Sequence, residues 1–297
     1  MLPSVTPGPV ITGVTNPNIV TLLRDGVTDD DCLSRFDWYA ATLLADSRTI
    51  TEHLVKTSLL LTPQGHGRFG YSEVYEGILP GGTSYTLLTG GNRGAPPNVY
   101  GSGGNAPEVG AMLRTLTWRH RVTRADSALD FEGSGVWETL TGYLVEFAHE
   151  RGLDIANAGD WISDAAPRGR TLYVGSRKSK AFLRCYEKGK QLGDADSKWV
   201  RVELVIRPEG EQRDKAAFVS PDDLWGFAGW PSELAPWLMG GLVPGRVTAS
   251  RRHSTDPLHT RLIALFKRNN RLLSQGITKY GAKKLMHLLE TTLEDAQ

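Results

Sequence analysis

The stretches TLYVGSRKSKAFLRCYEKGK, residues 171–190, and KWVRVELVIR, residues 198–207, decide the fold that the sequence predicts. Both alternate apolar and polar residues with the two-residue period of a β-strand, which places neighbouring side chains on opposite faces. One face of each predicted strand is apolar and belongs against a core. The other face carries arginine, lysine, tyrosine and glutamate, so the sequence predicts a sheet with one charged face.

A third stretch, TRADSALDF at residues 123–131, has the same alternation and adds carboxylates to this face. A solvated sheet face with cross-strand ion pairs, each contributing ~0.2–1 kcal/mol, would explain the pattern. Alternatively, the carboxylates hold a divalent metal ion through oxygen ligands and the cations hold phosphates. The residue pattern leaves both explanations open. The polar side chains expected on one face are Arg124, Asp126, Asp130, Arg184, Tyr186, Lys188, Lys190, Arg201 and Glu203.

The order of the predicted elements is similar in two parts of the chain. A strand at 35–43 precedes a helix at 46–60, further strands, a glycine-rich loop at 90–105 and a helix at 107–116. A strand at 121–131 then precedes a helix at 133–152, capped by Ser134, and three strands. This order predicts an α+β fold whose antiparallel central sheet is built from two related strand-helix-strand units.

The sequence also suggests a division into regions. Residues 1–34 are rich in Pro, Gly, Thr and Asp and are expected to form a flexible arm. The sheet is expected over 35–210, with halves at about 35–118 and 119–210. Residues 211–297 are expected to form a helical, basic C-terminal extension, since ten Lys and Arg but one acid lie between Arg246 and His287.

Composition limits the classes of protein that fit. With 297 residues, 40% hydrophobic and 23% charged, the chain can bury a core as a soluble protein does. A net charge of +1 argues against a uniformly basic nucleic-acid binder, so local charge matters more. The two cysteines, Cys32 and Cys185, are too few for a disulfide framework or a zinc site. With no signal peptide and no apolar run that could span a bilayer, we expect a cytoplasmic protein without a membrane partner.

Three ordered motifs carry a family resemblance. They are Arg-x-Asp-x-Ala-x-Asp at 124–130, Tyr-x-Gly-Ser-Arg-Lys-Ser leading into Leu-Arg-x-Tyr-x-Lys at 173–188, and Trp-x-Arg-x-Glu at 199–203. Together they resemble the replication initiation factors of rolling-circle plasmids and filamentous phages, the Rep_trans family, which is similar to the HUH endonucleases. The resemblance implies a metal-dependent enzyme that nicks and rejoins one strand at a replication origin through a covalent 5′-phosphotyrosine.

Residue by residue, the resemblance assigns the nucleophile to Tyr186, with Arg184 and Lys188 beside the phosphate. It implies that Mg²⁺ or Mn²⁺ is held by Asp126, Asp130 and Glu203. No His-x-His pair occurs, so carboxylates would have to hold the metal ion. The partners implied are origin DNA, as a single-stranded or cruciform nick site plus duplex, and a host helicase and polymerase; a homodimer is allowed. The expected DNA-binding residues are Arg124, Arg177, Lys178, Arg201, Lys267, Arg268, Lys279, Lys283 and Lys284.

Several alternatives stay open on the sequence alone. Tyr173, on a neighbouring predicted strand, is the second candidate nucleophile. A non-enzymatic DNA-binding regulator of replication or transcription would use the same cations without chemistry, and a globular protein with no nucleic-acid role is a third possibility. The tail segment at 272–289 fits either a helix-turn-helix with Gly276 at the turn or an ordinary basic helical hairpin.

Overall fold

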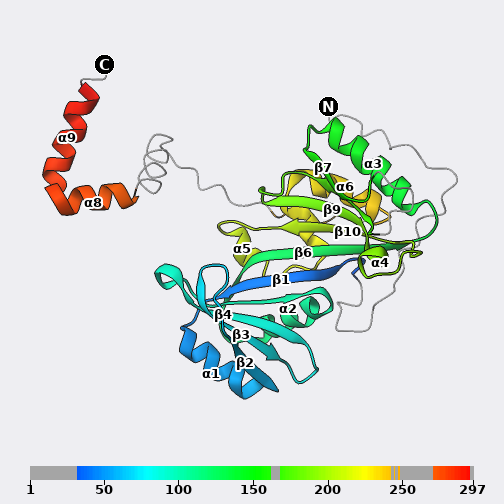
Figure 1. Ribbon diagram of the computed structural model, residues 1–297, viewed down its shortest axis with the longest axis horizontal. Helices are drawn as coiled ribbons and strands as arrows, with labels where there is room; N and C mark the ends of the chain where they lie inside the picture. The colour runs from blue at the N-terminus through cyan, green and yellow to red at the C-terminus, as the bar shows by residue number, and fades with distance from the viewer. Residues whose placement is uncertain (1–31, 162–167, 242–243, 245–246, 248–269, 295–297) are drawn as a thin grey trace. The chain divides into compact units, whose positions relative to one another are not determined.

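The computed structural model describes residues 32–161, 168–241, 244, 247 and 270–294 (Figure 1). The chain divides into two compact units, residues 1–249 and 250–297. In the described part of the first unit, ten strands form one antiparallel sheet in the order β2-β3-β4-β5-β1-β6-β10-β9-β8-β7. The strands are β1 (Arg35–Leu43), β2 (Leu60–Gln64), β3 (Tyr71–Ile78), β4 (Ser84–Gly91), β5 (Asn98–Ser102), β6 (His120–Glu132), β7 (Ile155–Gly159), β8 (Arg170–Val174), β9 (Ala181–Glu187) and β10 (Trp199–Ile206). The expectation of helices combined with an antiparallel sheet is confirmed.

The longer helices of this unit pack on one face of the sheet. They are α1 (Ser47–Thr57), α2 (Ala106–Thr115), α3 (Val136–Glu150) and α6 (Gly229–Leu238). Their buried residues share one core with the apolar side chains of the central strands, among them Leu129, Val202 and Leu204. The short helices η1 (Asn92–Gly94), η2 (Gly103–Asn105), α4 (Lys188–Gln191), α5 (Gln212–Lys215) and η3 (Asp223–Phe227) lie between these elements along the chain.

The opposite face of the sheet is the charged face that the alternation predicts. Directly paired residues of antiparallel strands share a face. Arg201 on β10 is opposite Asp130 on β6 and Tyr186 on β9. Glu203, two residues further, is opposite Ala128 and Arg184. The register therefore brings residues from motifs far apart in the sequence side by side on this face.

The structure differs from the sequence prediction at several elements. The stretch expected to be a glycine-rich loop contains β5, because residues 98–102 pair with β1 on one side and β4 on the other. The strand β7 was not expected. Helix α3 is capped by Gly135, with φ 74°, and its cap makes no side-chain hydrogen bond, so Ser134 is not the cap. Lys190 lies in α4, beyond the end of β9, and forms an ion pair with Glu187 at 2.9 Å.

The second unit contains two helices in its described part, α8 (Asn270–Tyr280) and α9 (Ala282–Glu294). They are separated by Gly281, whose φ of 78° suits glycine at a helix end. The helix-turn-helix alternative with its turn at Gly276 is wrong, because this residue lies inside α8. A Cβ atom there would lie 3.1 Å from Leu285 Cδ1, so the glycine permits a close approach of the two helices.

None of the described helices is long and apolar enough to cross a lipid bilayer.

A buried hydrogen-bond chain attaches the segment after β10 to the sheet. The Asp222 carboxylate accepts from the Leu33 and Ser34 backbone N–H groups at 2.9 and 2.8 Å and from the Ser34 hydroxyl at 2.5 Å. Ser127 on β6 donates to Ser34 and accepts from the Trp225 indole, both at 2.9 Å. Residues 211–241, the first part of the predicted C-terminal region, therefore pack with the sheet.

We expect Asp222→Ala to lower the free energy of unfolding by roughly 2–4 kcal/mol, because it leaves buried backbone donors without acceptors. Urea denaturation followed by tryptophan fluorescence measures the change. The matched control is Asp223→Ala, since that neighbouring carboxylate accepts a hydrogen bond from the Ser220 hydroxyl within its own turn. Equal losses for the two variants would contradict the anchoring role of Asp222.

Candidate active site

Tyr186 lies at one end of a chain of hydrogen bonds on the charged face. Its hydroxyl donates to Glu203 Oε2 at 3.1 Å, and Arg184 donates to Glu203 Oε1. Asp126 is hydrogen-bonded to Glu203. Arg124 donates to both oxygens of Asp126, at 2.9 and 2.5 Å. Three strands thus supply a tyrosine, two carboxylates and two guanidinium groups to one site.

The two carboxylates in this chain of hydrogen bonds have pKa values that are shifted in opposite directions. Burial raises the pKa of Asp126 to about 7, because the lowering effect of Arg124 is too small to offset burial and the nearby charge of Glu203. Burial alone would also raise the pKa of Glu203, but Arg184 and the hydrogen bonds from Asp126 and Tyr186 hold it below its usual value. Asp126 therefore carries the proton of the pair, and Glu203 is the charged partner.

The phenol of Tyr186 is neutral in this arrangement. Its side chain is buried, at 6% exposure, and burial together with the charge of Glu203 raises its pKa above the usual value. Arg184 lies 5.5 Å and the Lys188 ammonium 5.7 Å from the centre of its ring. A nucleophilic role for Tyr186 thus requires a base for its proton and positive charge near the oxygen, and the side chains that could contribute both lie beside it.

Arg201 is held in a buried ionic cluster. Its guanidinium donates to both oxygens of Asp130, at 2.7 and 2.8 Å, and to Asp37 at 2.6 Å. The Trp199 indole also donates to Asp130, at 2.7 Å. Sequence reasoning missed Asp37, because a bulge between Phe36 and Trp38 breaks the two-residue period there. The expected DNA contact Arg201 and the expected metal ligand Asp130 are thus bonded to each other.

Three buried side-chain donors on the charged face have no hydrogen-bond partner in the described part of the chain: Trp38 Nε1, Arg184 Nε and Arg35 Nε, the last of which forms an ion pair with Asp130 at 3.5 Å. Arg35 is opposite Ala128, Trp38 is opposite Asp126, and Arg184 is opposite Glu203. Buried donors without acceptors are costly and rare in native proteins. Trp38 Nε1 and Arg184 Nε, beside Asp126 and Glu203, are the donors that a site for an acceptor-rich ligand, such as a phosphodiester, would require.

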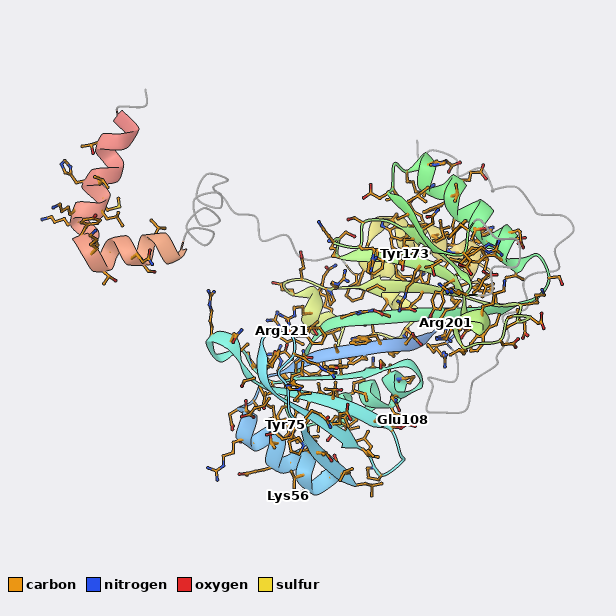
Figure 2. The ribbon with its side chains drawn as sticks, in the orientation of Figure 1. Lys56, Tyr75, Glu108, Arg121, Tyr173 and Arg201 are labelled. Atoms are coloured by element: carbon orange, nitrogen blue, oxygen red, sulfur yellow. The ribbon has the colours of Figure 1, made fainter. Side chains whose placement is uncertain are left out.

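The other predicted residues lie in several places. Tyr173 on β8 is opposite Arg184, and Figure 2 shows it in the same half of the sheet as Arg201. Arg177 and Lys178 are exposed in the loop between β8 and β9, and the Arg177 guanidinium lies 4.9 Å from the centre of the Tyr173 ring. In the second unit, three expected DNA-binding residues are exposed and two lie outside the described residues. The former are Lys279, Lys283 and Lys284, and the latter are Lys267 and Arg268.

The donor set can be compared with what a metal ion requires. Mg²⁺ binds through one or two carboxylates and completes its coordination with water and substrate phosphate. Asp126 and Glu203 are adjacent, but their oxygens already accept hydrogen bonds from Arg124, Arg184 and Tyr186, so an ion there would have to displace these donors. Asp130 is likewise held by Arg201 and Trp199. Within the described ranges, no group of three or more His, Cys, Asp or Glu side chains is arranged to hold a metal ion.

The comparisons with known proteins bear on this site. Residues 120–219 match the replication initiation factor family. The matched segment contains β6, β9 and β10, and with them Tyr186, Glu203 and Asp126, so the family resemblance inferred from the three motifs is confirmed.

A likeness to one solved structure accompanies this family match. The chain is similar to a rolling circle replication initiator protein from Geobacillus stearothermophilus, at 15% sequence identity and a TM-score of 0.48. The similarity covers 72% of this chain and 99% of that chain. Comparison with curated proteins gave no match.

The raised pKa of Asp126 predicts a pH dependence of stability. Because the folded-state pKa of Asp126 is about 7 and its usual value is 3.8, the folded protein binds an extra proton between these values. The resulting stabilisation is complete below the usual value and is lost as the pH rises through about 7. Asp126→Asn removes this titration.

We therefore expect the stability of the wild-type protein to fall, relative to that of Asp126→Asn, as the pH rises from about 4 to about 7. Urea denaturation of both proteins in EDTA over this range measures the difference, and all other titrating groups are common to both. A difference that is constant with pH would show that Asp126 does not hold the proton.

Proposed function

We propose that this protein initiates rolling-circle replication by nicking and rejoining one DNA strand at an origin, with Tyr186 as the nucleophile. The observation that carries the proposal is the hydrogen bond from the Tyr186 phenol to Glu203, beside Asp126 and Arg184 on the charged face. The match of residues 120–219 to replication initiation factors supports the same function.

The proposed reaction exchanges one phosphodiester for another. The Tyr186 phenolic oxygen forms a bond to phosphorus as the bond to the 3′ oxygen breaks, and Glu203 Oε2 accepts the phenolic proton. The leaving 3′ oxygen takes a proton from Lys188, whose pKa is lowered by burial and by Arg201. The products are a 5′-phosphotyrosine and a free 3′ hydroxyl, and the reverse reaction rejoins the strand without ATP.

Cations and donors of the charged face would bind the scissile phosphate. Arg184 Nε is buried beside Glu203 without a hydrogen-bond partner in the described residues, so a phosphate oxygen could accept from it. A Mg²⁺ or Mn²⁺ ion at Asp126 and Glu203 would supply further positive charge at a non-bridging phosphate oxygen. Arg177 and Lys178, in the exposed loop, would contact the phosphates of neighbouring nucleotides.

The proposal extends to partners and to internal organisation. Origin DNA would be bound as a single-stranded or cruciform nick site with flanking duplex, a host helicase would unwind it, and a host polymerase would extend the 3′ hydroxyl.

We also infer that the two halves of the sheet are related units. The order β2-β3-β4-β5-β1 in one half mirrors β7-β8-β9-β10-β6 in the other, and α1 and α3 follow the corresponding strands β1 and β6.

The first prediction of the proposal is that Tyr186→Phe abolishes covalent attachment to DNA. This substitution removes only the hydroxyl, so the fold and the binding of DNA should persist. The assay incubates labelled single-stranded origin DNA with Mn²⁺ and separates protein-DNA adducts by denaturing electrophoresis. Tyr173→Phe is the matched control, because its ring lies on the same face, and it should still form the adduct.

Two outcomes would contradict this assignment in different ways. An adduct formed by Tyr186→Phe but not by Tyr173→Phe would make Tyr173 the nucleophile. If the wild-type protein binds the DNA but never becomes joined to it, the protein is a non-enzymatic regulator. Mass spectrometry of the digested wild-type adduct should find the nucleotide on the peptide containing Tyr186.

A second prediction concerns the carboxylates. Glu203→Gln should lower the nicking rate at least about a hundredfold, because general base catalysis typically contributes that much, while DNA affinity is kept. The exposed Glu209 gives a matched control, and Glu209→Gln should nick at the wild-type rate. Nicking by the wild-type protein should also stop in EDTA. Equal rates in EDTA and in Mg²⁺ would show that the carboxylates hold no essential metal ion.

A further inference from the structure

An aromatic stack extends from the candidate active site into the other half of the sheet. The rings of Trp38 on β1 and Tyr100 on β5 are stacked, with centroids 4.9 Å and planes 10° apart. The Arg124 guanidinium lies 4.5 Å from the centre of the Trp38 ring and bonds to Asp126. On the other side, Phe69 lies edge-on to Tyr100 at 6.5 Å. One continuous row therefore connects Phe69 to the carboxylate pair.

Phe69 has one feature that a purely structural role does not explain. Its side chain is 76% exposed, although it is large and apolar. Its φ of 54° belongs to a two-residue hairpin turn, in which the Tyr71 N–H group donates to the Arg68 carbonyl at 2.9 Å and Gly70 has a φ of 83°. The turn between β2 and β3 thus holds a phenylalanine ring in solvent, next to the stack.

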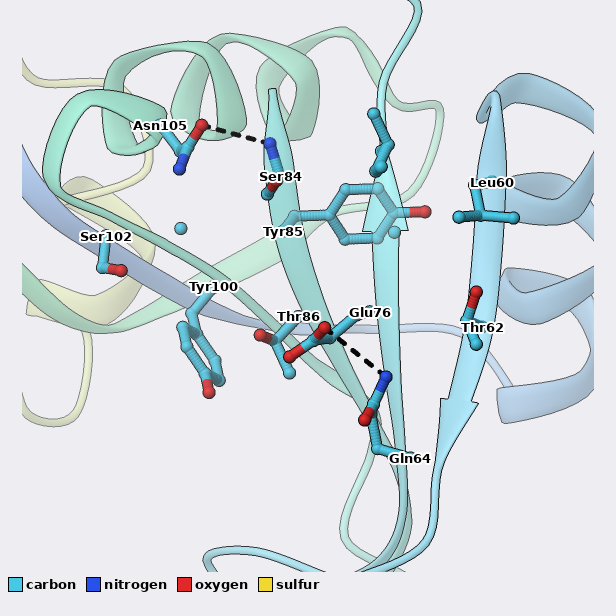
Figure 3. Close-up of a pocket in the computed structure, with 13 residues that line it drawn as sticks. Leu60, Thr62, Gln64, Glu76, Ser84, Tyr85, Thr86, Tyr100, Ser102 and Asn105 are labelled. Carbon is cyan, nitrogen blue, oxygen red and sulfur yellow. Dashed lines mark hydrogen bonds between the residues drawn. The ribbon is translucent and has the colours of Figure 1, made fainter. Parts of the chain in front are cut away.

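Beside the stack is a hollow of about 550 Å³ on the same face of the sheet (Figure 3). Tyr100 belongs to both, and its neighbours in the hollow include Gln64, Glu76, Thr86 and Asn105. Register confirms the shared face, because Tyr100 is opposite Thr86 on β4 and opposite Ala40 on β1, which in turn is opposite Arg124. A volume of this size is within the range of ~300–1,000 Å³ that is typical of ligand pockets.

The side chains that line the hollow are better suited to bind nucleobases than phosphates. Among the described residues that line the hollow, none is Lys or Arg, and Glu76 contributes a carboxylate. Amide, hydroxyl and carboxylate groups of this kind can bond to the donor and acceptor edges of nucleobases. Aromatic side chains stack on unpaired bases with little dependence on sequence. In a duplex these base faces are covered, so the surface suits a single strand.

We propose that the stack of Phe69, Tyr100 and Trp38, with the hollow beside it, binds bases of single-stranded DNA flanking the phosphate at the candidate active site. Tyr100 on β5 and Tyr186 on β9 are four strand spacings apart, about 19 Å at ~4.8 Å each, so the bound strand extends over several nucleotides. The identity of that phosphate rests on the proposed function, whereas the binding of bases is measured separately.

Fluorescence anisotropy tests the proposal with full-length protein carrying Tyr186→Phe, so that binding is measured without a covalent product. The probes are a labelled oligothymidylate and a chain of abasic sites of the same length. Phe69→Ala and Tyr100→Ala should each weaken binding of the oligothymidylate at least about fivefold, the contribution typical of one stacked base. Binding of the abasic chain should not change.

Two control variants separate stacking from other effects. Tyr100→Phe keeps the ring and should keep the affinity, which guards against a folding defect in Tyr100→Ala. Phe218 is a comparably exposed phenylalanine, at 80%, that lies near His120 and away from the charged face. Phe218→Ala should bind the oligothymidylate as the parent protein does.

The proposal is overturned if Phe69→Ala and Tyr100→Ala bind the oligothymidylate as tightly as their parent, or if they weaken binding of both probes equally. Covalent trapping of DNA by protein that retains Tyr186 distinguishes failure of the base-binding proposal from failure of the proposed nicking function. If the variants show the expected order of affinities but no adduct forms, the base-binding proposal stands and the nicking proposal is wrong. If an adduct forms but the affinities of the variants for the oligothymidylate are unchanged, the nicking proposal stands and the base-binding proposal is wrong.

Discussion

The register of β10 between β6 and β9 is the constraint on which the candidate active site depends. In this register Glu203 is opposite both Ala128 and Arg184, and Asp126 and Tyr186 lie close enough to bond to it. A slip of one residue would turn Glu203 toward the helices and place Val202 or Leu204 on the charged face. The apolar residues that alternate with the charged ones therefore determine where the chemistry occurs, because their burial against the helices fixes the register.

Arg201 reinforces that register with charge. It bonds Asp130 on β6 and Asp37 on β1, so a single guanidinium, 1% exposed, connects three central strands. A buried charge is tolerated only where its partners satisfy it, and removal of one partner is costly. The same face thus contains two kinds of charged group. The Arg201 cluster is internally satisfied and orders the strands, whereas the groups around Glu203 include buried donors without partners in the described residues and can bind a ligand.

The sequence predicted those parts of the site that lie within regular strands. Asp126, Arg184, Tyr186 and Glu203 follow an unbroken two-residue period, so their common face could be inferred from the alternation alone. Asp37 could not be placed, because it is the extra residue of a bulge, and Lys188 follows the end of β9 in a short helix. The pairing of β1 with β6, which brings Trp38 and the Tyr100 stack beside Asp126, joins segments that no local pattern connects. For the same reason β5 was mistaken for part of a loop.

The central position of the β1 and β6 pair also determines how the chain can be divided. The two halves of the sheet meet only through these strands within the sheet order, so separating them between residues 118 and 119 would expose two long edges with unpaired backbone groups. Each fragment alone would expose an unpaired strand edge and would be prone to aggregate, whereas the two edges could pair with each other. Fragments cut between residues 118 and 119 should therefore reassemble when they are expressed together, because β1 of one can pair with β6 of the other. The activity of the protein would then depend on the presence of both fragments.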